Sequence, residues 1–95
     1  MHISQIIITL RKRKNLSQVE LAKKIGLTQA SLSNIESNKK APHKSTITKI
    51  CEALEVPEQW FYFLALDEND LPVNGKGRFH AIGQEAQQIL LNSIS

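Results

Sequence analysis

The chain has 95 residues, with 12 Lys and Arg against 9 Asp and Glu, and a formal charge of +3. This length favours one domain with a short tail over a multidomain enzyme. Residues 1–56 carry ten basic and four acidic side chains, net +6, whereas residues 57–95 carry two and five, net −3. The basic segment suits an anionic partner such as nucleic acid or a membrane surface.

Cysteine content and hydropathy narrow the class of protein further. The single cysteine, Cys51, cannot form an internal disulfide, and the apolar run at 6–8 is too short to cross a bilayer. That run also lacks the positively charged start of a signal peptide. We therefore expect a soluble protein of the cytoplasm.

The first predicted element is a helix that starts near Ile3. Apolar residues recur at positions 3, 6, 7 and 10, which is helical spacing. The basic stretch 11–14 suits the negative end of this helix, and Asn15 ends it.

Two short helices follow. A capping box begins the second helix, since Ser17 can accept a backbone N–H while Glu20 reaches back to the N–H of Ser17. Gly26 ends this helix, because glycine tolerates a left-handed conformation, and Thr28 is a good N-cap for the third helix. The apolar positions of the second helix are Val19, Leu21, Ala22 and Ile25, and in the third helix Leu32 and Ile35 are expected to face inward.

These two helices and their glycine-containing turn predict a helix-turn-helix motif. A polar loop over 37–42 follows, in which Asn38 is the expected left-handed residue. Either His43 or Ser45 can cap a fourth helix, and Pro57 fits the first turn of a fifth. No strand-like alternation occurs up to residue 66, so we predict an all-α domain. Its later apolar positions are Ile47, Ile50, Cys51, Ala53, Leu54 and the run 60–64.

The chain changes character after Leu66. Acidic residues at 67–70 and a Pro and two Gly within 71–77 predict a linker over 67–78. The tail, 79–95, has a helical pattern over about 80–93 that Gly83 weakens. Its apolar positions are Phe79, Ile82, Ala86, Ile89 and Leu90.

The residues of the motif resemble those of the Cro and lambda-repressor-like helix-turn-helix regulators, which include the xenobiotic-response-element type. The resemblance covers about residues 3–66. It implies a five-helix domain that binds operator DNA as a homodimer and regulates transcription, typically as a repressor, without a cofactor. It also implies a bacterial or phage protein at the nucleoid. The matching stretches are Leu16-Ser17-Gln18-Val19-Glu20-Leu21-Ala22, Gly26 and Ser31-Leu32-Ser33-Asn34-Ile35-Glu36, with Pro42, Ile47, Ala53, Leu54 and Val56.

One departure from the family pattern is Asn38, where a glycine is usual; asparagine can also adopt the left-handed conformation at some cost. The resemblance further implies an ion pair between Arg11 and Glu36 that ties the first helix to the third. A structural role for this pair is favoured over DNA contact.

In this fold the third helix lies in the major groove of DNA. Gln29 and Asn34 carry amides that can pair with an adenine edge, and Ala30 can touch a thymine methyl. The alternative is that these side chains only solvate an exposed helix face. The candidates for base contact are Thr28, Gln29, Ala30, Ser33 and Asn34; those for phosphate contact are Gln18, Ser31, Asn38, Lys39 and Lys40.

Catalytic and membrane-surface functions are disfavoured. His2, His43 and His80 are scattered, and none has metal-ligand spacing with Cys51 or a carboxylate, so we expect no enzyme and no metal site. A membrane-surface helix needs many basic residues opposite bulky apolar ones, and the tail has almost none.

A protein-binding surface is expected at the fifth helix and the tail. Trp60, Phe61, Phe63 and Leu64 fall in one arc of the helix, whereas Tyr62 and Leu66 point the other way. This pattern fits either a core covered by the tail or, as we favour, a dimer seam. The tail could swap onto a partner subunit, fold back, or capture a toxin as an antitoxin does. The expected dimer or partner surface consists of Tyr62, Leu66, Phe79, Ile82 and Ile89.

Overall fold

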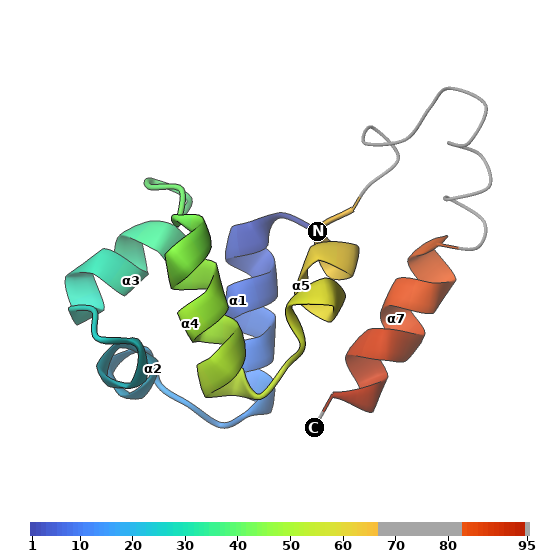
Figure 1. Cartoon of the computed structure of the whole chain (residues 1–95), viewed down its shortest axis with the longest axis horizontal. Helices are drawn as coiled ribbons and strands as arrows, with labels where there is room; N and C mark the ends of the chain where they lie inside the picture. The colour runs from blue at the N-terminus through green and yellow to red at the C-terminus, as the bar shows by residue number, and fades with distance from the viewer. Residues whose placement is uncertain (67–82, 95) are drawn as a thin grey trace.

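The computed structural model describes residues 1–66 and 83–94. These residues form six α-helices and no strand, so the all-α prediction is confirmed (Figure 1). Five helices lie within 1–66 and the sixth lies in the tail. They are α1 (Ile3–Arg13), α2 (Gln18–Ile25), α3 (Gln29–Glu36), α4 (Lys44–Leu54), α5 (Glu58–Ala65) and α7 (Gln84–Ser93).

Helix α1 lies at the centre of the domain. It packs against α3, α4 and α5, which surround it in Figure 1. Ile6, Ile7 and Leu10 on α1 are completely buried, as their spacing predicts. Asn15 follows the helix with a φ of 57°, and this left-handed conformation turns the chain towards α2.

The start of α4 is at one of its two predicted caps, whereas the start of α5 is shifted by one residue. His43 occupies the N-cap position of α4 but makes no side-chain cap hydrogen bond. Pro57 stands at the N-cap position of α5, one residue before the predicted first turn. Its carbonyl oxygen accepts from the N–H groups of Trp60 and Phe61.

Not every residue of the predicted apolar positions is buried. Val19 is 44% exposed, because it lies two residues from Leu21 and about 200° around the helix from it. Trp60 is 41% exposed although it lies inside the predicted arc, while Phe61 and Leu64 are completely buried.

Helix α7 packs against α5 in the same chain (Figure 1). It begins at Gln84, directly after Gly83, and buries Gln87, Leu91 and Ile94. The predicted apolar side of the tail is therefore wrong at Ile89, which is 61% exposed. Leu90, another predicted apolar position, is partly buried and packs against the core. The fully buried positions are spaced by four and three residues and include a polar Gln, so counting apolar residues alone does not find the centre of the buried face.

Candidate nucleic-acid interface

The turn between α2 and α3 has the local chemistry that the sequence predicts. Gly26 has a φ of 73°, and the N–H of Leu27 donates to the carbonyl of Ala22 at 2.9 Å. Thr28 then caps α3, since its Oγ1 accepts from the N–H of Ser31 at 3.1 Å. These bonds fix the angle at which α3 leaves α2.

The N-terminus of α2 is closed by the predicted capping box. Ser17 Oγ accepts from the N–H of Glu20 at 3.1 Å, and a Glu20 carboxylate oxygen accepts from the N–H of Ser17 at 3.0 Å. Two hydrogen bonds with Ser17 hold the pKa of Glu20 below its ordinary value. The bond with the Ser17 backbone has the larger effect, and the bond with the Ser17 hydroxyl has the smaller one. Glu20 is therefore charged at the positive end of the helix dipole.

Helix α3 has one buried and one exposed side. Leu32 and Ile35 are 0% and 4% exposed and fix the helix to the core. Gln29, Ala30 and Asn34 are exposed. The outward amides of Gln29 and Asn34 thus have the access that base recognition needs.

The three hydroxyl residues near the start of α3 differ in availability. The hydroxyl of Thr28 donates to that of Ser31 at 3.0 Å, so these two side chains already bond each other. Thr28 is exposed, whereas Ser31 and Ser33 are half-buried. Because Ser31 and Ser33 are half-buried, either of them could contact DNA only if α3 approached the DNA closely.

Arg11 and Glu36, the expected ion pair, are joined by two hydrogen bonds. Arg11 Nε and Nη2 lie 2.9 Å from Glu36 Oε2 and Oε1 respectively. Both side chains are largely covered, at 11% and 4% exposure. Arg11 Nη1 also donates to the carbonyl of Leu16 at 2.9 Å. One guanidinium on α1 therefore binds both to α3 and to the loop that precedes α2.

Gln18 joins the same group of polar side chains. Its Nε2 donates to Glu36 Oε1 at 3.0 Å. Gln18 is a half-buried residue and is the first residue of α2. Sequence reasoning missed this bond, since 18 residues separate Gln18 and Glu36 and no local pattern links them.

The loop after α3 turns back over the end of that helix. Asn38 has a φ of 63°, the left-handed conformation expected of it. The N–H groups of Lys39 and Lys40 both donate to the carbonyl of Asn34, at 2.9 and 3.2 Å. Both lysine side chains are exposed.

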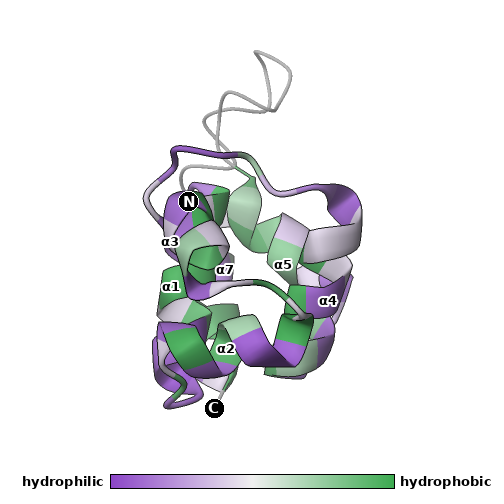
Figure 2. Cartoon of the chain, turned by 90° about the vertical axis from the view of Figure 1, so that its left-hand side faces the viewer, coloured by the Kyte–Doolittle hydropathy of each residue, from purple (hydrophilic) through white to green (hydrophobic). Residues whose placement is uncertain are grey.

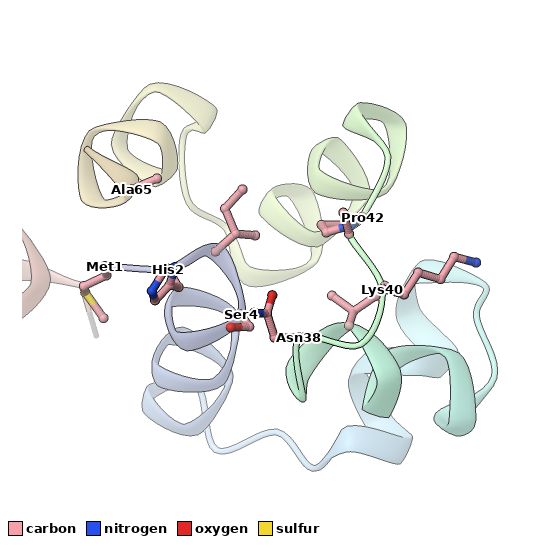
Figure 3. A pocket seen from close by; sticks show the side chains of 10 residues that line it. Met1, His2, Ser4, Asn38, Lys40, Pro42 and Ala65 are labelled. Atoms are coloured by element: carbon pink, nitrogen blue, oxygen red, sulfur yellow. The ribbon is translucent and has the colours of Figure 1, made fainter. Parts of the chain in front are cut away.

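A shallow hollow of about 310 Å³ separates this loop from the N-terminal end of α1 (Figure 3). Asn38, Ser4, Pro42 and Lys40 are among the residues that line it, and the long side chain of Lys40 extends away from the other labelled side chains. Lys40 is exposed, so its ammonium group is accessible to an anionic partner.

The model of the helix-turn-helix family matches residues 7–61, more than half of the chain. The chain belongs to this family. Segment 7–61 is therefore a DNA-binding helix-turn-helix domain, in which α2 and α3 are the helices of the motif.

Two kinds of curated relative are similar to about half of the chain. Antitoxin HipB of Escherichia coli K12 is 43% identical over 47 residues, which cover 50% of this chain and 53% of the relative. Antitoxin HigA1 of Mycobacterium tuberculosis H37Rv is 41% identical over 49 residues, which cover 52% of this chain and 33% of the relative. The matches thus span about half or less of the length of these relatives.

The predicted DNA-contact residues belong to α2, to α3 with its N-cap Thr28, and to the loop after α3. Figure 2 shows the side of the molecule on which α2 and α3 lie. Gln18, at the start of α2, reaches the end of α3 through Glu36, and the loop lysines follow that end directly. In the view of Figure 2, α2 faces the reader.

The predicted partner residues lie elsewhere on the helix-turn-helix protein. Tyr62 on α5 is 37% exposed and Ile89 on α7 is 61% exposed, while Leu66 is half-buried. Phe79 and Ile82 lie outside the described residues. Gln87 Nε2 donates to the carbonyls of Phe63 and Leu66 at 2.7 and 2.8 Å, which couples the tail to the end of α5.

The cysteine of the helix-turn-helix domain has a packing role. Cys51 on α4 is 3% exposed, and burial, with a smaller effect of Glu58, raises the pKa of its thiol to about 11. A thiol with this pKa is a poor nucleophile at neutral pH.

Within 1–66 and 83–94, no three His, Cys, Asp or Glu residues are close enough to hold a metal ion. Among the helices of the same ranges, none is long and apolar enough to span a membrane.

Proposed function

We propose that this protein is a sequence-specific transcriptional regulator, a repressor of the Cro and lambda-repressor type, without catalytic activity or cofactor. The observation that carries the proposal is the outward pair of amides on α3, Gln29 and Asn34, above a buried Leu32 and Ile35. Each amide can donate and accept on one adenine edge, which discriminates against the wrong base by about 1–3 kcal/mol. Thr28, Ala30 and Ser33 complete the proposed base-facing set.

Phosphate contacts fix the position of such a helix in the groove. We assign these contacts to Gln18 at the start of α2, to Ser31, and to Asn38, Lys39 and Lys40 after α3. The two exposed lysines support this assignment, because their positive charges attract the phosphate backbone. Regulation of this kind takes place where the chromosome is, in the cytoplasm of a bacterium or of a phage-infected cell.

We further propose that the protein binds as a homodimer to a roughly palindromic operator, with half-sites about one helical turn apart. Residues 1–66 form the DNA-binding domain, 67–78 the linker, and 79–95 the segment that contributes to dimer or partner contacts. The exposed Tyr62 and Ile89 support a protein contact on the side of α5 and α7.

Selection from random duplex DNA, followed by sequencing of the bound fraction, tests this proposal. The full chain should enrich a palindromic motif, and sedimentation should give the mass of two chains per selected duplex. Salt-sensitive binding without an enriched motif would contradict sequence-specific recognition. Enrichment of a single half-site by one chain would contradict the dimer.

A second function is favoured by the similarity to antitoxins HipB and HigA1. In this alternative the tail binds a toxin and the complex represses its own promoter. Co-expression with the product of the neighbouring gene discriminates the two functions. An antitoxin should abolish growth inhibition by that product and form a complex of fixed stoichiometry with it. Unchanged growth inhibition and separate elution of the two proteins would contradict this alternative.

A further inference from the structure

Glu36 is the acceptor on which three segments of the domain converge. Its Oε1 accepts from Arg11 Nη2 at 2.9 Å and from Gln18 Nε2 at 3.0 Å, while Oε2 accepts from Arg11 Nε at 2.9 Å. The Glu36 side chain is only 4% exposed. Within the described residues, no buried side-chain polar atom lacks a partner, so the group is fully satisfied.

The chemistry of this acceptor fixes which end of the Gln18 amide faces inward. A carboxylate paired with a guanidinium only accepts hydrogen bonds, so it selects the NH2 end of a neighbouring amide and excludes the carbonyl end. One N–H of Gln18 is used in this bond. The second N–H remains, and it is the kind of group that a phosphate oxygen accepts from.

The charges around Gln18 explain why an acidic residue is tolerated beside a DNA backbone. An unpaired carboxylate at this position would repel phosphate. Here Arg11 neutralises Glu36 with two bonds and is itself held by the carbonyl of Leu16 at 2.9 Å. The carboxylate can therefore orient the amide without presenting a free negative charge.

We propose that Glu36, held by Arg11, is a positioning residue for DNA binding: it fixes the rotamer and the amide end of Gln18 before DNA arrives. This inference rests on the proposed function, in which Gln18 contacts a phosphate. Preorganisation matters because an immobilised long side chain loses rotamer entropy on binding, a loss that a side chain ordered in advance has already incurred. The ion pair thus acts on affinity as well as on stability.

Two matched double variants separate these roles. Both carry Arg11→Met; the glutamine variant adds Glu36→Gln and the leucine variant adds Glu36→Leu. Each removes the ion pair and avoids an unpaired buried charge. Only the glutamine variant keeps an acceptor for Gln18. The neutral amide introduced by Glu36→Gln also permits the flipped orientation of the Gln18 amide. We expect this freedom to lower the affinity for DNA about twofold.

Affinity for a selected duplex is measured for both variants, with thermal unfolding as the control for folding. The glutamine variant should bind within about threefold of the natural chain, whereas the leucine variant should bind about tenfold more weakly. Adding Gln18→Ala should weaken the glutamine variant more than the leucine variant, because the two positions are coupled. Equal affinities of two folded variants would overturn the proposal.

A measurement on the natural chain keeps the test valid if the leucine variant does not fold. In the free protein, side-chain amide order parameters should show Gln18 to be rigid and the exposed Gln29 to be mobile. Equal mobility of the two amides would overturn the proposal. If the natural chain binds no duplex at all, the proposed function fails, and a rigid Gln18 would then have a structural role only.

Discussion

At the scale of single residues, neighbouring positions of α3 differ sharply in environment. Gln29 and Asn34 are exposed to solvent, whereas Leu32, which lies between them in the sequence, is completely buried. The helical repeat alone predicts this division, because about 100° separates successive side chains. Substitutions on the two sides should therefore affect different properties, DNA recognition on one and stability on the other.

Gln29→Ala tests the exposed side. We expect about a tenfold loss of affinity for the selected duplex and a relaxed preference at one base pair of each half-site, because a bidentate amide contact is lost. The stability of the fold should change by less than about 0.5 kcal/mol. Competition binding on single-base variants of the duplex measures this effect.

Lys39→Ala is the matched control for Gln29→Ala. It should weaken selected and scrambled duplexes alike and reduce the slope of log affinity against log salt by about one unit. Equal losses on both duplexes for Gln29→Ala would contradict its role in base recognition.

Residue pairs that are distant in sequence were predictable only through the family pattern. The contact between Arg11 and Glu36 was implied by the resemblance, while the bond from Gln18 to Glu36 was not foreseen. Caps and core positions depend on neighbours within four residues, which the sequence displays directly. A bond across 18 residues depends on the angle at which α2 crosses α3, and this angle cannot be inferred from the composition of the sequence.

At the scale of elements, the ends of helices are set by individual residues. The Ser17–Glu20 capping box and the left-handed Gly26 bound α2 as predicted from sequence. Helix α4 ends differently: Glu55 adopts a left-handed conformation with a φ of 57°, although it has a side chain. Sequence did not indicate this, since Glu55 resembles any solvated helical residue.

Glu55→Gly should raise the free energy of unfolding by up to about 1 kcal/mol, because glycine avoids the steric cost of the left-handed region. Chemical denaturation followed by circular dichroism measures the change. The matched control is Gly26→Ala, which should destabilise by about 1–2 kcal/mol. A Cβ at Gly26 would meet no atom within 4 Å, so its cost arises from backbone strain alone. No gain in stability for Glu55→Gly would contradict the assigned strain.

The capping box should make the stability of the fold depend on pH in the acidic range. The pKa of Glu20 is lowered in the fold, so its contribution is fully present above the ordinary value of 4.5 and is lost as pH falls through the lower folded value. Glu20→Gln removes the charge at every pH. The difference in stability between Glu20→Gln and the natural chain should therefore shrink between pH 6 and about pH 3. A difference that stays constant over this range would show that the charge of Glu20 does not contribute.

At the scale of the whole molecule, the tail helix is part of the hydrophobic core. Leu91 and Ile94 are 8% and 6% exposed and cluster with the core residues of α5. A tail helix was predicted from sequence, but not its buried face, because Gln87 is polar and its burial depends on two carbonyls at the end of α5. Tertiary contacts of this kind cannot be recognised from hydropathy.

Leu91→Ala should lower the free energy of unfolding by about 2 kcal/mol, since it leaves a cavity between α7 and α5. Ile89→Ala on the same helix is the control and should have an effect below about 0.5 kcal/mol. If Ile89 belongs to the dimer surface, that control variant should also shift the mass measured by light scattering towards one chain. No effect of Leu91→Ala would contradict the packing of α7 on α5.

We propose that α3 reads DNA sequence while the exposed lysines that follow it hold the DNA backbone. The most direct test is the affinity of the full chain for a selected duplex and for a scrambled one, measured over a series of salt concentrations. We predict that the selected duplex binds at least about 1,000-fold more tightly at physiological salt, and that both affinities fall as salt rises. Equal affinities for the two duplexes at every salt concentration would contradict the claim.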